Sequence, residues 1–353
     1  MSRIKCRKAI AFCCNEAYRP YALFAAYRIA TLRKEKDFDI YICDAEAFDI
    51  PPALSDLGIA SLALNPGMHF AGLSTDDRRC NSAYYRLLLP SRLGEAYDRI
   101  LYLDADIHVQ GGDFSRLLEL DLHGSPIAAV RDNPQWRTPG RLPKDFKALD
   151  LPYAPYFNSG VMVIDTATWK DKAIDDRIAS CRSQYGKSLK RHDQTLLNAV
   201  LHGDWAEISP VWNWQYSKAA RLHEALVSAN IIHFIGREKP WNATDGSLAP
   251  RFGRDLSRFL ADHLPVTPEI SATQPIDLRN KSVISMLLRH VWNRRKMARY
   301  LDLFRDEYVA VKARPRTARV STSGLASLRR KVREQGFGFS TDPLNVQRPP
   351  TGK

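Results

Sequence analysis

Short apolar runs alternate with helical patterns along the first two thirds of the chain. Residues 9–14 form a continuous apolar run that polar Asn15 and Glu16 end, as expected of a strand buried on both faces of a mostly parallel sheet. Residues 21–34 place apolar side chains at helical spacing, and residues 38–43 form a second strand. A strand, a helix and a strand in this order predict an α/β domain.

The same patterns predict the elements that follow. We expect helices over residues 84–92, 192–202, 254–264 and 283–308, and strands over 99–103, 127–130, 160–164 and 231–234. Residues 134–155 are rich in proline and charge and predict a long loop. We therefore expect a main α/β domain (residues 1–265), a linker (266–280) and a basic, partly helical extension (281–353) that is poorly ordered beyond residue 314.

The charge is distributed unevenly along the chain. The 353 residues carry a net charge of +13, but residues 279–353 hold 18 Lys and Arg against 5 Asp and Glu, so the remainder is neutral. A nucleic-acid-binding protein is one interpretation of such charge. The neutral body, and the lack of basic and aromatic residues interleaved outside the tail, argue against it. Apolar runs are all shorter than the roughly 18 residues that cross a bilayer.

The six cysteines favour a reducing compartment. None of them is spaced as Cys-x-x-Cys, and the adjacent pair Cys13 and Cys14 is badly placed to bridge to itself, so neither structural zinc nor a disulfide framework is expected. The apolar run near the N-terminus is shorter than the core of a secretory signal. We therefore expect a cytoplasmic protein, either free or peripheral on the inner face of the membrane.

Two aspartates directly follow a predicted buried strand. Side chains two apart in a strand point the same way, so Asp104 and Asp106 direct two carboxylates at one place, at the sheet edge where α/β proteins bind ligands. A divalent cation relieves the repulsion between them, although such a pair also simply ends a strand. Asp-x-Asp also opens the haloacid-dehalogenase phosphatase motif, an alternative weakened by Ile107 and by the lack of a later acidic pair.

Four blocks in order resemble glycosyltransferase family 8, the retaining GT-A enzymes that include glycogenin and bacterial lipopolysaccharide galactosyl- and glucosyltransferases. They are YYRLLLP with YDRILYLDAD (84–106), YFNSGVMVI (156–164), HDQTLLN with the later WN (192–213) and IHFIGREKPW (232–241). The resemblance implies a GT-A fold, an α/β fold with a mostly parallel central sheet flanked by helices. It also implies transfer of galactose or glucose from a UDP-sugar to a saccharide or lipid-linked acceptor, in lipopolysaccharide or surface polysaccharide synthesis.

The resemblance also implies a metal site. Asp104 and Asp106, with His233 as the third ligand, would hold a cation that bridges the two phosphates of the donor. Two carboxylates and one imidazole suit Mn²⁺ better than Mg²⁺, which remains the alternative, because imidazole matches the harder ion poorly. The metal would neutralise the charge that develops on the diphosphate as it leaves the anomeric carbon.

Further residues of the implied site surround the sugar and the phosphates. Gln194 falls where the family keeps a glutamine beside the anomeric carbon, and Asp193 and Asn158 would hydrogen-bond the sugar hydroxyls. Lys239 would supply charge to the β-phosphate, and Gly236 would let the backbone come close to it. The remaining donor contacts expected are Arg86, Ala105 and Asp132.

The first loop resembles the uridine-binding segment of the family, but with differences. Tyr18 is in place to stack on uracil, and the backbone around Cys13 would contact the base. Asn15 stands where the family has an aspartate and Ala17 where it has an asparagine. Thr195 likewise replaces an aspartate beside Gln194. The segment expected to contact the base and the ribose is therefore where this sequence departs from the family pattern.

The basic extension has two interpretations. Arg294, Arg295, Lys296 and Arg299 lie beside apolar residues at helical spacing, which is typical of a helix on an anionic membrane surface. The alternative is a solvated helix packed on the catalytic domain. The pattern alone does not decide between them.

Overall fold

A computed structural model describes residues 6–65, 82–186, 192–236, 238–242, 248–267, 270 and 281–315. These residues belong to a compact unit, Met1–Arg316. The predicted linker lies almost wholly outside the described residues, as do the residues beyond 315. The division into domains therefore stays a prediction.

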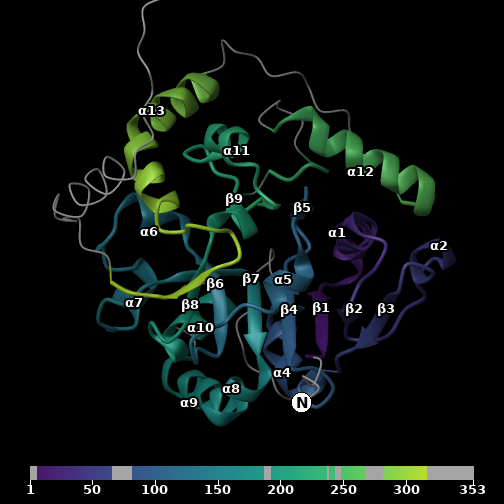
Figure 1. Ribbon diagram of the computed structural model, residues 1–353, viewed down its shortest axis with the longest axis horizontal. Coiled ribbons are helices and arrows are strands. Elements are labelled where there is room, and N and C mark those ends of the chain that lie inside the picture. Colours follow the sequence, from purple (N-terminus) through teal and green to yellow (C-terminus); the bar gives the residue numbers. More distant parts are fainter. Residues whose placement is uncertain are drawn as a thin grey trace, which may run out of the picture. The chain divides into compact units, whose positions relative to one another are not determined.

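A large mixed sheet forms the centre of the unit (Figure 1). Its strand order is β11-β8-β6-β7-β4-β1-β2-β3. Parallel pairs join β1 to β2 and β4, β2 to β3, and β6 to β8, whereas β7 runs antiparallel to both β4 and β6. The strands are β1 Lys8–Cys13, β2 Asp39–Asp44, β3 Ile59–Ala63, β4 Arg99–Leu103, β6 Ile127–Arg131, β7 Phe157–Asp165, β8 Ala206–Ile208 and β11 Ala310–Lys312.

A second, three-stranded sheet continues from the end of β4. It has the order β5-β10-β9. Its strands are β5 Ile107–Val109, β9 Trp214–Gln215 and β10 Ile231–His233. Three residues, Asp104, Ala105 and Asp106, separate β4 from β5. The chain therefore passes from the large sheet to the small one at the two predicted aspartates.

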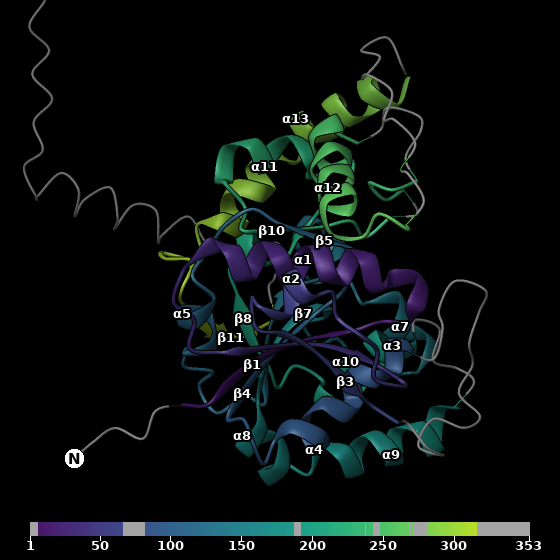
Figure 2. The same cartoon turned by 90° about the vertical axis from the view of Figure 1, so that its right-hand side faces the viewer.

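Helices cover both faces of the large sheet (Figure 2). They are α1 Arg19–Leu32, α2 Pro52–Ser55, α3 Ser82–Tyr85, α4 Leu89–Leu93, α5 Phe114–Leu118, α6 Asn133–Arg137, α7 Lys144–Ala148, α8 Thr166–Asp171, α9 Ile174–Tyr185, α10 His192–Leu201, α11 Arg221–Val227, α12 Pro250–His263 and α13 Lys281–Leu301, with 3₁₀ turns η1 Glu16–Tyr18, η2 Arg86–Leu88 and η4 Pro210–Trp212. Figure 2 shows α1 on one side of the strands and α4, α8 and α9 on the other.

Strand alternation explains these two layers. Ile10 and Phe12 of β1 enter the core beneath α1, whereas Ala11 and Cys13 enter the core beneath α9 and α10. A strand whose side chains are apolar on both faces is buried between two helical layers. The continuous apolar pattern of residues 9–14 was therefore sufficient to predict a central strand, and the expected α/β fold with a central sheet flanked by helices is confirmed.

The predictions of local structure for residues 84–92 and 134–155 are wrong. The expected helix over residues 84–92 consists of three short pieces, α3, η2 and α4, because Pro90 lies in the first turn of α4 and starts a new helix there. The expected loop over 134–155 contains α6 and α7. Both are five residues long, which is too short to show a helical period in the sequence.

The C-terminal elements add to the same unit. Helix α12 packs against α1, α13 contacts α6 and α11, and β11 pairs with β8 at the edge of the large sheet. Residues 302–308, expected to continue α13, form a turn instead. Among the described helices, none is both long enough and apolar enough to cross a bilayer.

Candidate functional site

The two aspartates are fixed at the junction between the sheets. The backbone N–H of Asp104 donates to the carbonyl of Gly160 on β7 (2.8 Å), and the carbonyl of Asp106 accepts from the N–H of Phe234 (3.0 Å). The large sheet thus holds one aspartate and the small sheet holds the other. Both carboxylates stay partly accessible.

His233 reaches the aspartates through strand pairing. Strand β10 runs antiparallel to β5 with His233 opposite Ile107, the residue after Asp106. Its Nε2 lies 3.5 Å from Oδ2 of Asp104 and 3.3 Å from Oδ1 of Asp106. The three side chains that the sequence assigns to a metal therefore meet at one point.

This arrangement fits a divalent cation. Each of the three residues offers a ligand atom, and these atoms lie within 4.8 Å of one another. Nδ1 of His233 is 2.9 Å from Oδ1 of Asn213, whose amide nitrogen donates to Asn158 Oδ1 (2.9 Å). The carbonyl side of Asn213 therefore faces the imidazole, Nδ1 carries the proton, and the lone pair of Nε2 faces the carboxylates, as metal ligation requires.

Gly160 leaves the space that this cluster occupies. A Cβ at this position would lie 2.3 Å from Cε1 of His233 and 2.7 Å from Oδ2 of Asp104, closer than such atoms approach. Strand β7 therefore runs against Asp104 and His233 only because residue 160 has no side chain.

Arg86 neutralises one side of the cluster. It is buried, with its guanidinium 2.9 Å from Oδ1 of Asp104 and 3.2 Å from Oδ2 of Asp193. Burial opposes its charge, but these two carboxylates outweigh burial and raise the pKa of Arg86. Arg86 also donates to the backbone carbonyl of Ser159 (3.0 Å). It is thus a fixed charge inside the site rather than a surface arginine.

Lys239 neutralises the other side. Its Nζ lies 2.5 Å from Oδ2 of Asp106 and also donates to the carbonyl of Phe234. Burial would raise the pKa of Asp106, but its contacts with His233 and Lys239 outweigh burial and hold that pKa well below its usual range. Asp106 is therefore an ionised ligand.

The sum of these charges indicates what the site accepts. Asp104, Asp106 and Asp193 contribute three negative charges, and Arg86 and Lys239 contribute two positive ones. With His233 neutral, the cluster carries one net negative charge and attracts a cation. A divalent ion would reverse the sign to one net positive charge, which then attracts an anion such as a diphosphate.

The sugar-binding residues predicted on β7 and α10 also meet. Oε1 of Gln194 accepts from the amide of Asn158 (3.3 Å) and the backbone N–H of Ser159 (3.2 Å). The Ser159 hydroxyl donates to Asp193 Oδ2 (3.3 Å). The hydrogen bonds and ion pairs thus form a closed ring through the residues Asp104, Arg86, Ser159, Gln194, Asn158, Asn213 and His233.

The predicted base-binding loop is less complete. Cys13 ends β1 and is buried, and burial raises the pKa of its thiol. The side-chain oxygen of Asn15 is buried without a hydrogen-bond partner among the described residues. Tyr18 packs edge-on against Tyr21 (5.8 Å) and Trp241 (5.9 Å). Tyr21 and Trp241 stack at 3.6 Å, which fastens the segment after Lys239 to the start of α1.

Three further predicted donor residues have weaker geometric support. Ala105 is buried between the two aspartates. Asp132 is buried at the start of α6, and its backbone N–H donates to Tyr156. Gly236 is exposed, and among the described residues a Cβ there would meet only the backbone nitrogen of Glu238 at 3.9 Å. The described residues therefore do not require a glycine at 236, and the assignments of Ala105, Asp132 and Gly236 stay predictions.

Three residues of the site were not predicted to have a role in it. The hydroxyl of Tyr102 donates to Asp104 (2.5 Å), and burial raises its pKa so that it stays a donor. Ser159 and Asn213 complete the ring. Strand alternation could have indicated Tyr102, which lies two positions before Asp104, and Ser159 directly follows the predicted Asn158. Nothing in the sequence pairs Asn213 with His233.

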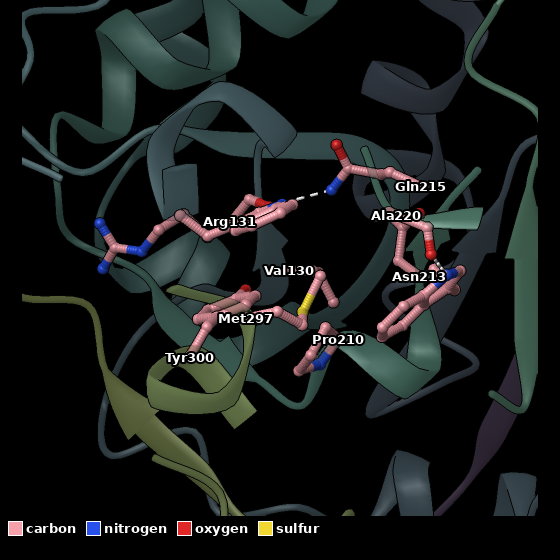
Figure 3. Close-up of a pocket in the computed structure, with 10 residues that line it drawn as sticks. Val130, Arg131, Pro210, Asn213, Gln215, Ala220, Met297 and Tyr300 are labelled. Atoms are coloured by element: carbon pink, nitrogen blue, oxygen red, sulfur yellow. Dashed lines mark hydrogen bonds between the residues drawn. The ribbon is translucent and has the colours of Figure 1, made fainter. Parts of the chain in front are cut away.

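Asn213 also lines a small pocket (Figure 3). Its other walls include Arg131, Gln215, Met297 and Tyr300. The pocket has room for about one water molecule. Because Met297 and Tyr300 belong to α13, the C-terminal helix forms part of the wall of this pocket.

Comparison with known families agrees with this geometry. The family model described as Glycosyl transferase family 8 matches residues 9–245, more than half of the chain and every residue of the polar ring. The chain belongs to glycosyltransferase family 8. The resemblance seen in the four sequence blocks is confirmed, and the match favours a transferase over the phosphatase alternative.

Individual family 8 relatives share moderate identity with this chain. General stress protein A of Bacillus subtilis is 34% identical over 177 residues, which is 46% of this chain and 59% of that protein. The lipopolysaccharide 1,2-glucosyltransferase of Escherichia coli K12 is 30% identical over 192 residues, 48% of this chain and 54% of that protein. The chain thus spans little more than half the length of these curated relatives.

Solved structures show the same fold. The galactosyltransferase LgtC, solved in complex with donor and acceptor sugar analogues, has a TM-score of 0.58 at 21% identity and covers 74% of this chain and 98% of its own. The bifunctional glycosyltransferase WbbM has a TM-score of 0.55 at 16% identity, over 82% of this chain and 53% of its own. At these identities the likeness concerns the fold alone.

Proposed function

We propose that the protein transfers a hexose from a UDP-sugar to a saccharide acceptor, with retention of configuration and with Mn²⁺ as the metal. The observation that supports this most is the convergence of Asp104, Asp106 and His233 between two fixed cations, Arg86 and Lys239. A cation site that becomes positive when filled suits a nucleotide diphosphate. Mg²⁺ is the alternative metal.

The relatives suggest the sugar and the product. One relative is named a lipopolysaccharide 1,2-glucosyltransferase and another, 26% identical over 173 residues, a lipopolysaccharide 1,3-galactosyltransferase of Salmonella typhimurium. We therefore propose glucose or galactose as the transferred sugar, and lipopolysaccharide or a surface polysaccharide as the product. The cytoplasmic location expected from the cysteines is part of this proposal.

The residues of the site divide the work of transfer. The bound metal would supply positive charge to the departing diphosphate. Arg86 and Lys239 add two fixed charges that need no reorientation during the reaction. Asn158 and Asp193 orient the sugar, and the aromatic contact between Tyr21 and Trp241 holds the segment that carries Lys239.

Gln194 indicates how the configuration is retained. An amide is a poor nucleophile, so we propose that the acceptor hydroxyl attacks the anomeric carbon on the face from which the diphosphate leaves. The carbon–oxygen bond to the phosphate breaks, a bond to the acceptor oxygen forms, and the departing phosphate oxygen takes the hydroxyl proton. Trapping of a sugar covalently bound to any side chain would contradict this route.

Thermal unfolding with candidate donors tests the proposal. UDP-glucose, UDP-galactose and UDP-N-acetylglucosamine are each added with and without Mn²⁺, and ligand binding raises the unfolding temperature by mass action. We expect a shift that requires both metal and nucleotide and that Asp106→Asn abolishes. Asp171→Asn, which changes an exposed carboxylate on α8, is the matched control. A nucleotide shift that a chelator leaves undiminished would refute the metal site.

A further inference from the structure

Helix α13 exposes a row of large apolar side chains. Leu288, Val291 and Trp292 are 67%, 62% and 80% exposed. Ile284 and Leu287, each 48% exposed, precede them. These five positions follow the spacing i, i+3, i+4, i+7, i+8, so they share one face of the helix, which we call the apolar face of α13.

The opposite face of α13 is packed. Asn293, Met297 and Tyr300 are buried, and the ring of Tyr300 stacks parallel to that of Trp136 on α6 (6.4 Å, 6°). The helix is therefore fixed to the body of the protein by one side, and its apolar face points away from it. The contrast with α12 is informative, because α12 buries its apolar side chains Phe252, Leu256, Phe259 and Leu260.

Positive charge accompanies the apolar face. Helix α13 contains six Lys and Arg and no Asp or Glu. Arg295 and Arg299 lie 11 and 15 positions after Ile284 and so continue the line of the apolar face, and both are exposed. The exposed side of the helix is thus apolar in its first half and cationic in its second.

The combination of apolar and cationic residues indicates which kind of surface would cover the exposed side of α13. A second copy of the chain would bring two strongly cationic helices together, and like charges repel. A neutral apolar protein groove would leave the arginines unpaired. The surface of an anionic bilayer satisfies both halves, because leucine and tryptophan enter the headgroup–acyl boundary while arginine binds lipid phosphates.

We propose that α13 docks the protein on the surface of a membrane that contains anionic phospholipids. The helix lies on the bilayer rather than across it, since its packed face remains on the protein and six charges exclude it from the hydrocarbon interior. The docking residues are the five of the apolar face together with Arg295 and Arg299.

Docking has a consequence for the acceptor, which rests on the proposed function. The packed face of α13 supplies Met297 and Tyr300 to the pocket that Asn213 lines, and Asn213 contacts His233. One helix therefore has the proposed membrane on one face and, on the other, the pocket that Asn213 lines, and an α-helix is only about 10 Å across. The acceptor class that this placement favours is a lipid-linked saccharide.

Vesicle co-sedimentation of the full chain, without donor, tests the docking. The vesicles are phosphatidylcholine with and without phosphatidylglycerol. We expect binding that requires the anionic lipid. Leu288→Asn with Trp292→Asn should lower the partition coefficient at least tenfold. Arg295→Gln with Arg299→Gln should lower it about twentyfold, since each basic residue contributes about fivefold. Val266→Asn, which changes an apolar residue that is 97% exposed outside α13, is the control.

Several outcomes would overturn the proposal. Wild type and both α13 variants partitioning equally would do so, as would a wild-type dimer in sedimentation velocity that Leu288→Asn with Trp292→Asn dissociates, since the apolar face would then be a contact between copies. Circular dichroism confirms that the variants keep their helices. Binding of UDP with Mn²⁺ to the same variants in solution is measured separately, so failure of the docking and failure of the donor site are distinguishable.

Discussion

Two parts of the site differ in how many of their polar groups have partners within the protein. The metal half is the part around Asp104, Asp106 and His233, and the base half is the loop that carries Asn15 and Tyr18. In the metal half, Asp104 pairs with Arg86, Asp106 pairs with Lys239, and His233 contacts Asn213. At the base loop, the oxygen of Asn15 is buried without a partner among the described residues.

The difference follows from the cost of buried charge. Ionised carboxylates at a sheet junction require partners before any ligand arrives, because desolvated charge is costly. A neutral amide and an aromatic ring tolerate an incomplete environment at much smaller cost. The metal half is therefore built in advance by the fold, whereas the base half would rely on the proposed nucleotide to complete its contacts. The sequence differs from the family pattern in this second half, at Asn15 and Ala17.

Removal of one ligand charge should have the largest effect. Asp106→Asn keeps the shape of the side chain but removes the charge shared by His233 and Lys239. We expect Mn²⁺-dependent UDP binding and sugar transfer to fall about a thousandfold, because metal stabilisation of the departing phosphate is worth several kcal/mol. Calorimetric titration with Mn²⁺ and UDP measures it. Asp171→Asn should bind as wild type, and near-normal binding by Asp106→Asn would contradict the assignment.

Filling the space at Gly160 should displace the ligands without removing any of them. The added methyl of Gly160→Ala would overlap His233 and Asp104. We expect Mn²⁺ affinity to fall roughly a hundredfold, comparable to loss of a residue that orients a ligand. Gly111→Ala is the control, since its Cβ would meet only Oδ1 of Asn230 at 3.8 Å. Equal Mn²⁺ affinity in the two variants would show that the cluster is not the metal site.

Asn213 should couple the metal to the sugar residues. Asn213→Leu removes both of its contacts and should lower Mn²⁺ affinity between about 10- and 100-fold. Asn213→Asp keeps an acceptor for His233 but no longer donates to Asn158. It should therefore keep Mn²⁺ affinity and lose catalytic rate. Electron spin resonance measures the Mn²⁺ affinity, and a transfer assay measures the catalytic rate. If Asn213 were purely structural, both variants would lose both the affinity and the rate.

The base half should respond to mutation independently of the metal half. Tyr18→Ala removes the ring predicted to stack on uracil, and base stacking is worth about 1–3 kcal/mol. We expect UDP affinity to fall between about 5- and 150-fold with Mn²⁺ affinity unchanged, measured by the same titrations. A parallel loss of both affinities would show that the two halves are not separable.

Much of the fold was predictable because the central strands are buried on both faces. Strand β4 has the bounds expected from its apolar run, and Asp104 and Asp106 follow it as predicted. The one-turn helices α6 and α7 were not predictable, since five residues show no period.

The site was predictable only in part, because its contacts are tertiary. His233 joins the aspartates through the pairing of β10 with β5, and strand register across 127 positions leaves no local signal. The family resemblance supplied that ligand. The burial of Arg86 and the bridging role of Asn213 depend on the packing of β7, which no pattern in either segment encodes.

A crystal structure with Mn²⁺ and UDP, using anomalous scattering from the manganese, tests the central claim most directly. The account predicts an anomalous peak bound by Asp104, Asp106 and Nε2 of His233, with the diphosphate completing the coordination. A nucleotide bound without manganese between these residues, or manganese bound elsewhere, would contradict it.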